Sequence, residues 1–482
     1  MRTTLHRLQW FVAQPYARWF VIFLAVAALI HPDYGTNPQS RFAALCALAE
    51  DHSLRIDHYK DLTIDWARTP DGHYYSNKAP GPVVLVCPVF WLMDAFWTAG
   101  EADRAARDQT RLAHCSLSLA LLSLLFQALP FAILTAVALG WLESCGASPA
   151  ALHLGCLAML FGNTAALFMN TYFGHGMAAA CALALCLCLV KRRHFWGGLA
   201  YGLAMLADYS SALLLPGFLA AALLREPRGL RVRALWKIAL GGLLPGAVWV
   251  AYHSACFGGP FTLPASYQNP MFVDAGRNEI LGLFSLAPQP EVAAWLLVGF
   301  QRGLLWSQPW LLVLVLSCIG WRSIAPRLSD RAREAGRTML IFLLPGLFLL
   351  LWMNASFGEW QGGSTPGPRY LCSVFPAFGL LAGLLYDHLS LTVRRLLIGG
   401  IVLSVAFWVL AFSTQILVPA GQTIWGFTLR LLVDGDSPGG IIRLVALVVV
   451  FEWQLYRLLR IRHGKAPSTP REEKVRTLSK SS

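Results

Sequence analysis

The 482-residue sequence has few charged residues, and only a minority of those are acidic: 13% of the residues are charged, with 26 Asp and Glu against 39 Lys and Arg. Soluble proteins carry about 25% charged residues, so this scarcity, together with 56% hydrophobic residues, excludes an ordinary soluble protein. The apolar runs do not alternate between polar and apolar positions, which excludes a transmembrane β-barrel. Because backbone in lipid must satisfy its own hydrogen bonds, each run is predicted to be a membrane helix.

Metal-ligand spacing is also missing. The eleven cysteines form no CxxC pair and no Cys/His pattern with the spacing of a metal site. We expect most of them to be small apolar residues inside helices. A disulfide between Cys46 and Cys87 is left open, since both are predicted on the external side. We find no internal repeat, so the inverted-repeat plan of many transporters is not supported.

The net charge of +13 comes from short Lys and Arg clusters beside apolar runs. That arrangement is typical of positive-inside topology and argues against nucleic acid as a partner. Arg2, Arg7 and Arg18 precede the apolar run 19–30, which resembles a signal sequence. We expect an uncleaved first span, because a long polar segment and many further apolar runs follow it. Both termini are then predicted to be cytoplasmic, in the inner (plasma) membrane of the cell.

The apolar runs cross the membrane in alternating directions. If residues 83–98 do not cross it, every Lys and Arg cluster lies on the cytoplasmic side. That stretch is short, contains Pro88 and Asp94 and is rich in aromatic residues, so we predict a juxtamembrane or re-entrant element at the outer leaflet. The predicted spans are residues 16–31, 112–142, 149–169, 174–190, 195–207, 210–224, 235–253, 303–320, 338–353, 371–386, 396–413 and 438–456.

The predicted fold class is therefore an all-α polytopic membrane protein with a bundle of about twelve transmembrane helices. The bundle occupies residues 1–456, which include a long first external loop, residues 32–111, with juxtamembrane helices. Residues 457–482 form a basic tail that is predicted to be disordered and cytoplasmic.

The first external loop is the main candidate for a functional segment, because it is rich in acidic residues in an otherwise basic chain. Asp33, Asp57 and Asp65 are candidate general bases, a role that needs an ionised carboxylate near an acceptor hydroxyl or amine. Lys78 precedes the apolar element, which would place its ammonium at headgroup depth beside a lipid-linked phosphate. The structural alternatives are a turn or helix cap for Asp33 and an interfacial lysine for Lys78.

Other polar residues are predicted at the outer ends of helices, where they and the first loop could line one external cavity. Arg369, two residues after Gly367, offers a planar fork for a phosphate. His175 opens a helix from the outside, where an imidazole could form a hydrogen bond or serve only as a helix-end residue. The other candidate cavity residues are His73, Tyr74, Tyr75, Tyr172, Asp208, Tyr267, Arg302, Glu359 and Trp360.

Four segments resemble the GT-C membrane glycosyltransferases, in particular bacterial relatives of the protein O-mannosyltransferases and the lipid A aminoarabinose transferase. HYYSNKAPG, residues 73–81, is similar to the family segment in which a lysine followed by prolines approaches the lipid phosphate. NPQSRFAALCALAEDHSLRID, residues 37–57, is similar to the family's helix that follows the catalytic acid, and Arg41 matches the family's arginine. WQGGSTPGPRYL and RGLLWSQPW resemble segments of bacterial members. The resemblance implies that Lys78 binds the donor phosphate, and Arg369 and Arg41 are further candidates for that role.

The resemblance further implies an enzyme that transfers a sugar from a polyprenyl-phosphate carrier to an external acceptor, which is a lipid, a glycan or a protein. Family members carry an Asp-Glu pair before the arginine, whereas this chain reads Asn37-Pro38-Gln39-Ser40. Asp33 is the nearest substitute for the acid, and Asp57 and Asp65 are alternatives. The fold allows a divalent metal ion, for which the sequence offers no ligand set. The alternative function is a transporter or flippase of lipid-linked or small polar substrates, which predicts charged residues near the bilayer midplane.

Overall fold

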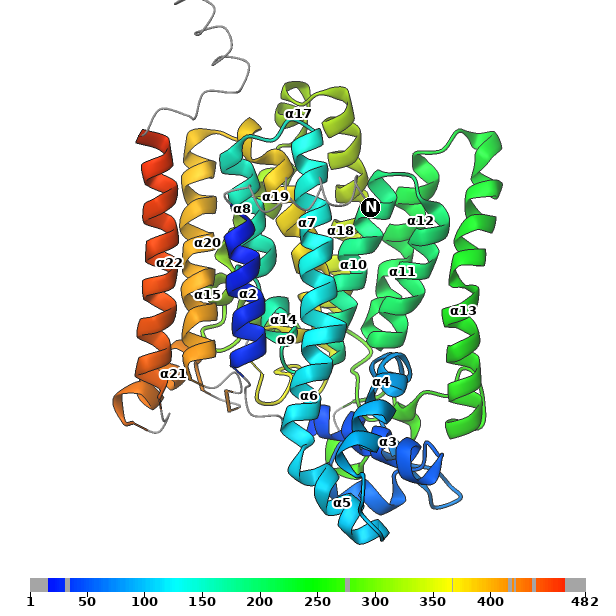
Figure 1. The fold of residues 1–482 in the computed structure, drawn as a ribbon. Coiled ribbons are helices and arrows are strands. Elements are labelled where there is room, and N and C mark those ends of the chain that lie inside the picture. The colour runs from blue at the N-terminus through cyan, green and yellow to red at the C-terminus, as the bar shows by residue number, and fades with distance from the viewer. Residues whose placement is uncertain are drawn as a thin grey trace, which may run out of the picture.

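The computed structural model describes residues 16–30, 35–273, 278–365, 367–414, 418–419, 422–435 and 439–463. These residues are mostly helical, and the strands among them form one two-stranded sheet. A bundle of long, roughly parallel helices makes up most of the molecule, and a smaller group of elements covers one end of it (Figure 1). We call this smaller group, residues 36–113, the cap.

The cap combines short helices with a small hairpin. Its elements are α3 (Thr36–Asp51), η1 (Asp57–Leu62), β1 (Trp66–Arg68), β2 (Tyr74–Ser76), α4 (Gly81–Trp97) and α5 (Arg104–Ala113). The strands are antiparallel, with Ala67 opposite Tyr75. The cap has an apolar core of its own, in which the rings of Phe42 on α3 and Phe90 on α4 meet edge to face at 5.9 Å. This core fixes α4 on α3.

Helix α4 coincides with the apolar element predicted at residues 83–98. Val86 and Phe90 are buried on its inner side, while Leu92 and Phe96 on the outer side are 74% and 79% exposed. Pro88 lies inside the helix without ending it. A helix that is apolar on its exposed side as well as its buried side is suited to contact with lipid.

The bundle consists of helices of very different lengths. They are α2 (Ala17–Leu29), α6 (Cys115–Ser123), η2 (Leu124–Ala128), α7 (Leu129–Ser144), α8 (Pro149–Leu160), α9 (Ala165–Phe168), α10 (Gly174–Val190), α11 (His194–Ala207), η3 (Tyr209–Leu214), α12 (Leu215–Leu224), η4 (Arg228–Leu230), α13 (Arg231–Phe257), α16 (Pro309–Ile319), α17 (Trp321–Ile324), α18 (Asp330–Ser356), η8 (Arg369–Val374), α19 (Phe375–Leu385), α20 (Leu391–Ser413) and α22 (Gly440–His463). Connecting segments contain η5 (Pro264–Tyr267), η6 (Pro270–Phe272), α14 (Pro290–Val298), α15 (Leu304–Ser307), η7 (Ala325–Arg327), η9 (Tyr386–His388) and α21 (Ile424–Val433).

Several helices are long and apolar enough to cross a membrane, so this is a multi-pass helical membrane protein. Among the described residues five pass by length and composition, namely Cys115–Ser144, Arg228–Phe257, Asp330–Ser356, Arg369–His388 and Leu391–Ser413. A sixth results if Pro309–Ile319 and Trp321–Arg327, which are bent by 78° at their junction, count as one broken span. Other apolar helices, such as α2 and α10, are shorter. The count of about twelve spans stays a prediction.

Two of the predicted spans are interrupted. The span 149–169 ends as α8 at Leu160 and resumes as the short helix α9, and the span 303–320 breaks before Pro309. The two breaks contact each other: the backbone N–H of Thr164 donates to Gln308 Oε1 at 3.1 Å, and the Trp310 indole N–H donates to the carbonyl of Gly162 at 2.5 Å. Interrupted helices are tolerated inside a bundle because neighbouring groups satisfy the freed backbone.

Close approach of α11 and α13 depends on glycine. A Cβ added at Gly202 would lie 2.7 Å from the ring of Pro245 on α13. Membrane helices gain little from burying apolar surface against each other, so small residues that allow tight van der Waals packing are favoured at such contacts. This packing ties α13, at the edge of the bundle, to the helices beside it (Figure 1).

The segments that carry the basic clusters, after α10 and α12 and before α18, lie at the end of the bundle opposite the cap (Figure 1). Arg192 after α10 and Arg225 after α12 both pair with Glu334 on α18, at 2.6 and 3.0 Å. Asp387 accepts hydrogen bonds from the backbone and the hydroxyl of Ser148 at the same end. Clustering at one end is what positive-inside topology requires. The assignment of that end to the cytoplasm stays a prediction.

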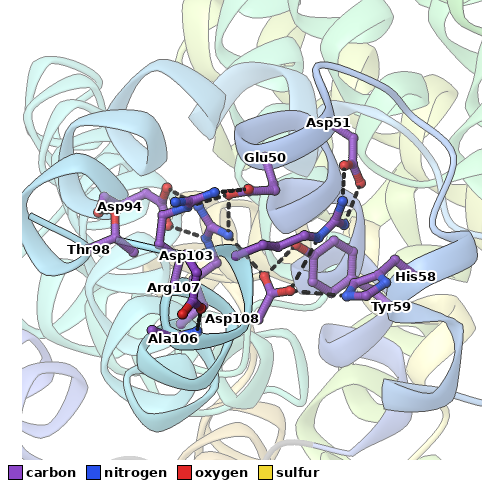
Figure 2. A network of polar contacts seen from close by, with 12 residues as sticks. Glu50, Asp51, His58, Tyr59, Asp94, Thr98, Asp103, Ala106, Arg107 and Asp108 are labelled. Atoms are coloured by element: carbon purple, nitrogen blue, oxygen red, sulfur yellow. Dashed lines mark hydrogen bonds and ion pairs between the residues drawn. The ribbon is translucent and has the colours of Figure 1, made fainter. Parts of the chain in front are cut away.

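An ion-pair network holds the cap together (Figure 2). Arg111 on α5, with a side chain only 3% exposed, binds Asp94 on α4 through two hydrogen bonds and Glu50 on α3 at 2.7 Å. Arg107 also donates to Glu50, and hydrogen bonds from Arg107 and Arg111 lower the pKa of Glu50 to about 2. Because α3, α4 and α5 share this network, the end of α4 is held against α3 and α5.

The cysteines are free thiols. All eleven lie within the described residues, and Cys46 and Cys87 are both buried in the cap without a disulfide. The disulfide left open by the sequence is therefore not formed.

Candidate functional site

An ion pair at the base of the cap hairpin is the centre of the site. Asp65 precedes β1 and Lys78 follows β2, so the antiparallel pairing of the strands brings the two residues together. Lys78 Nζ lies 2.9 Å from Asp65 Oδ1, and the hydroxyl of Thr36 at the start of α3 donates to Asp65 Oδ2 at 2.9 Å. The side chains of Lys78 and Asp65 are 17% and 11% exposed, so the pair is largely sheltered but still accessible.

Two arginines lie close to this pair. Arg41 on α3 is buried and donates to the backbone and side-chain oxygens of Asn37. Arg369 at the start of η8 stacks on the ring of Tyr370, with Cζ 4.7 Å from the ring centroid, and donates to its hydroxyl at 2.7 Å. The Nε atoms of both guanidinium groups are buried without a hydrogen-bond partner among the described residues. Buried donors without a partner are costly, and an anion would satisfy them.

The charges of these groups act on one another. Burial raises the pKa of Asp65, but Lys78, Thr36 and Arg369 outweigh it and hold that pKa below its usual value. Burial and the positive charges of Arg369 and Arg41 lower the pKa of Lys78 by more than Asp65 raises it. Burial also lowers the pKa of Arg41 to about 10. Asp65 is therefore ionised, but its single negative charge does not balance the positive charges of Lys78, Arg41 and Arg369.

A histidine–carboxylate pair adjoins the arginines. Nδ1 of His175, at the start of α10, is hydrogen-bonded to Asp208 Oδ2 after α11. The ring of Tyr370 meets the imidazole edge to face at 5.7 Å. The guanidinium of Arg369 stacks on the same tyrosine ring. With Arg41, Lys78 and Arg369 against Asp65 and Asp208, the cluster has an excess of positive charge when the imidazole is neutral. Such a cluster is suited to an anion.

The cluster lies at the seam between the cap and the bundle. The hydroxyl of Tyr172, before α10, donates to the carbonyl of Pro82 at 2.6 Å, and that of Tyr209 donates to the carbonyl of Lys78 at 3.5 Å. A Cβ added at Gly81 would lie 2.6 Å from the carbonyl oxygen of Leu206. The start of α4 therefore packs directly on the end of α11, and this contact fixes Lys78 relative to the bundle.

Other candidates, in the cap and in the segment after α13, contact partners outside the cationic cluster. Asp57 accepts from the backbone N–H of Tyr74 at 2.6 Å and contacts His73 Nδ1 at 2.7 Å, and both of these side chains are about one third exposed or more. Tyr75 and Tyr267 pack on the ring of Phe257 at the end of α13. These residues have local structural partners of their own. Asp33 lies outside the described residues, so its place relative to Lys78 stays a prediction.

The remaining candidates belong to the connecting segments of the bundle. Arg302 donates to backbone carbonyls of Gly363, Val418 and Pro419, at 3.0 to 3.4 Å, and thereby joins two loops. Trp360 packs on the α14–α18 contact, and Glu359 is exposed. Arg302 supports the loop that leads to Arg369.

Comparisons with known proteins identify a solved structure that is similar to this one. No family model matches the sequence, and no curated protein matches it. A crystal structure of ArnT from Cupriavidus metallidurans bound to undecaprenyl phosphate is similar to this structure, with a TM-score of 0.51 over 95% of this chain and 73% of that chain. ArnT is the lipid A aminoarabinose transferase, a GT-C glycosyltransferase. This chain has the GT-C fold. The sequences are 15% identical, so the likeness extends to the fold alone.

Within this GT-C fold, some site residues were missed by the sequence analysis. Thr36 and Tyr370 contact Asp65 and Arg369 directly, and neither was a candidate. Tyr370 follows Arg369 in the sequence, and an aromatic residue beside an arginine is a signal for stacking. Thr36 had no comparable signal, because its contact with Asp65 depends on how α3 packs on the hairpin. Among the described residues no three His, Cys, Asp or Glu converge to hold a metal ion.

Proposed function

We propose that this protein is an integral-membrane glycosyltransferase that moves a sugar from a polyprenyl-phosphate carrier to an acceptor at the cap end of the bundle. The observation that carries the proposal is the cationic cluster of Lys78, Arg41 and Arg369, with two buried guanidinium nitrogens that have no partner among the described residues. The fold adds support, because it is shared with a protein whose structure contains undecaprenyl phosphate. The donor phosphate is the anion that the cluster would bind.

The reaction would be a direct displacement with inversion at the anomeric carbon. The acceptor oxygen forms a bond to that carbon, the bond from the carbon to the phosphate oxygen breaks, and the electron pair leaves with the lipid phosphate. The phosphate changes from a diester with one negative charge to a monoester with up to two. Lys78, Arg369 and Arg41 stabilise the charge that develops, which is the kind of interaction that lowers a barrier. No nucleotide site is required, since the sugar arrives on the lipid.

We assign different roles to the candidate carboxylates of the first external loop. Asp65 is paired with Lys78 and hydrogen-bonded by Thr36, so we assign it to positioning the lysine rather than to proton transfer. Asp57 is held by Tyr74 and His73 away from the cationic cluster. Asp33 remains a predicted base that is tested below.

The membrane arrangement follows from the charge clusters. We place the basic end of the bundle in the cytoplasm, with both termini, and the cap on the external side of the inner membrane. The exposed apolar side of α4 would then rest in the outer leaflet, where the lipid donor resides. The acceptor is a lipid, a glycan or a protein, and the sugar is a hexose or a pentose.

The alternative function, a transporter or flippase, uses the same helices without chemistry. It requires polar groups along a path through the bilayer, whereas the cationic cluster lies at the seam between cap and bundle. The cap covers one end of the bundle (Figure 1). This placement favours the transferase.

The two functions are separated by one experiment. Purified protein is incubated with radiolabelled polyprenyl-phosphate sugars and with acceptors extracted from the membrane and cell envelope. The transferase releases lipid phosphate and labels an acceptor. Movement of substrate across vesicles without any release of lipid phosphate would reject the transferase and support the transporter.

A further inference from the structure

The His175–Asp208 pair has the arrangement of a general base. Asp208 accepts from His175 Nδ1, and its second oxygen accepts from the backbone N–H and the hydroxyl of Ser210, at 3.0 and 2.9 Å. A carboxylate that accepts at Nδ1 fixes the tautomer in which Nε2 carries the lone pair. Among the described residues none hydrogen-bonds His175 Nε2. Within the described part of the chain, Nε2 therefore has no hydrogen-bond partner and can accept a proton.

The ring is also held in one orientation beside the cationic cluster. Phe173 stacks near the imidazole at 6.1 Å between centroids, and Tyr370 meets it edge to face at 5.7 Å. Tyr370 in turn carries the guanidinium of Arg369. A Cβ added at Gly174, the residue before His175, would lie 2.9 Å from Arg41 Nη2. Both arginines that would bind the donor phosphate are therefore neighbours of this histidine.

Two other histidine–aspartate pairs lack this setting. His73 with Asp57 and His58 with Asp108 lie in the cap, and the histidine side chains are 34% and 56% exposed. The side chain of His175 is 10% exposed and that of Asp208 is 13% exposed. Partial burial beside the cations distinguishes the His175 pair from the other two.

We infer that His175, oriented by Asp208, accepts the proton of the acceptor hydroxyl in the proposed transfer. The inference rests on the proposed function. As the acceptor oxygen bonds to the anomeric carbon, its proton moves to His175 Nε2, and the electron pair of the broken bond leaves with the lipid phosphate. Asp208 is a positioning residue that stabilises the imidazolium, which later releases the proton to solvent. Asp33 is then not required for proton transfer.

The test uses full-length protein in lipid nanodiscs with a donor and acceptor pair that supports transfer. His175→Gln keeps the approximate size and polarity of the side chain but cannot act as a base, so kcat is expected to fall by roughly 10²–10⁴-fold. Affinity for undecaprenyl phosphate, measured separately, is expected to stay within about threefold, because the phosphate ligands are intact. His58→Gln, which alters a histidine–aspartate pair outside the site, should leave both quantities unchanged.

Two further variants distinguish chemistry from packing. His175→Ala should regain activity when imidazole is added, which a purely structural histidine would not do. Asp208→Asn places an amide donor at Nδ1 and selects the wrong tautomer, so kcat should fall by roughly 10³–10⁴-fold. Its effect should not add to that of His175→Gln, since the two residues act as one unit.

The outcomes separate the inference from the function on which it rests. Transfer by the wild-type protein with a kcat of His175→Gln within about threefold of wild type would overturn the inference and leave the proposed function standing. Loss of transfer in Asp33→Asn but not in His175→Gln would do the same and return the base to Asp33. Absence of transfer by the wild-type protein with every donor would reject the proposed function and the inference with it.

Discussion

Lys78 Nζ lies 2.9 Å from Asp65 Oδ1 across the open end of the cap hairpin. The lysine therefore already has a counter-charge before any ligand binds, and Thr36 holds the carboxylate from the other side. Arg41 and Arg369 add positive charge that Asp65 alone does not balance.

Asp65→Asn should destabilise the folded protein. It removes the carboxylate but leaves Lys78 buried near two arginines, so the free energy of unfolding should fall by roughly 2–3 kcal/mol, somewhat less than for a fully buried pair. Denaturation in detergent micelles measures this change. Asp61→Asn, which alters an 88% exposed partner of Lys60, is the control and should cost under about 1 kcal/mol. Equal stability of the two variants would show that the Asp65 ion pair contributes little.

Arg369→Gln should reduce turnover more than stability. The loss of a charge-assisted hydrogen bond to the donor phosphate predicts a fall in kcat/KM of about 10- to 100-fold, measured by release of lipid phosphate. Arg233→Gln, at an exposed position on α13 at the other end of the bundle, should have no effect. An unchanged kcat/KM for Arg369→Gln would exclude this residue from the phosphate site.

Gly81→Ala should displace the start of α4. The new methyl group would lie 2.6 Å from the carbonyl oxygen of Leu206, and backbone on both sides limits relaxation. We expect a loss of about 1–3 kcal/mol in stability, together with weaker donor binding because Lys78 precedes this contact. Gly140→Ala, where the added carbon meets nothing within 4 Å, is the matched control. Wild-type donor affinity in Gly81→Ala would show that Lys78 is positioned independently of α11.

Glu50 should make the stability of the cap depend on pH in the acidic range. Its pKa is about 2 in the folded protein against an ordinary value of 4.5, so its contribution is complete above about pH 4.5 and is lost as the pH falls towards about 2. The difference in melting temperature between wild type and Glu50→Gln should therefore shrink over this interval. The exposed Glu101→Gln provides the comparison and should show no such change. A constant difference for Glu50→Gln across these pH values would contradict the assignment.

The helical membrane architecture could be predicted from composition and hydropathy, and so could the apolar helix of residues 81–97, because both depend on local sequence. Lys78, Arg41 and Arg369 were candidates from their residue types and from the resemblance of short segments. Their proximity arises from contacts between α3, the hairpin and η8 that no local pattern encodes. The pairing of Asp65 with Lys78 depends on the strand register, which the sequence analysis did not address.

The interruptions of the predicted spans were also beyond the reach of hydropathy. Both broken segments are apolar. The side chains of Gln308 and Trp310 in one break form hydrogen bonds with backbone groups of the other break. A hydropathy average does not register where backbone hydrogen bonds are lost and replaced. For the same reason, the hydrogen bond between His175 and Asp208, 33 residues apart in sequence, could not be predicted from the chain alone.

Binding of undecaprenyl phosphate to the purified protein in nanodiscs tests the central claim most directly. The wild-type protein should bind the lipid phosphate, and Lys78→Met, which removes the ammonium but keeps an apolar stem, should bind it about 10- to 100-fold more weakly. Lys237→Met, at an exposed position at the basic end, should bind like wild type. Equal affinity of Lys78→Met and wild type would contradict a donor-phosphate site at the seam of cap and bundle.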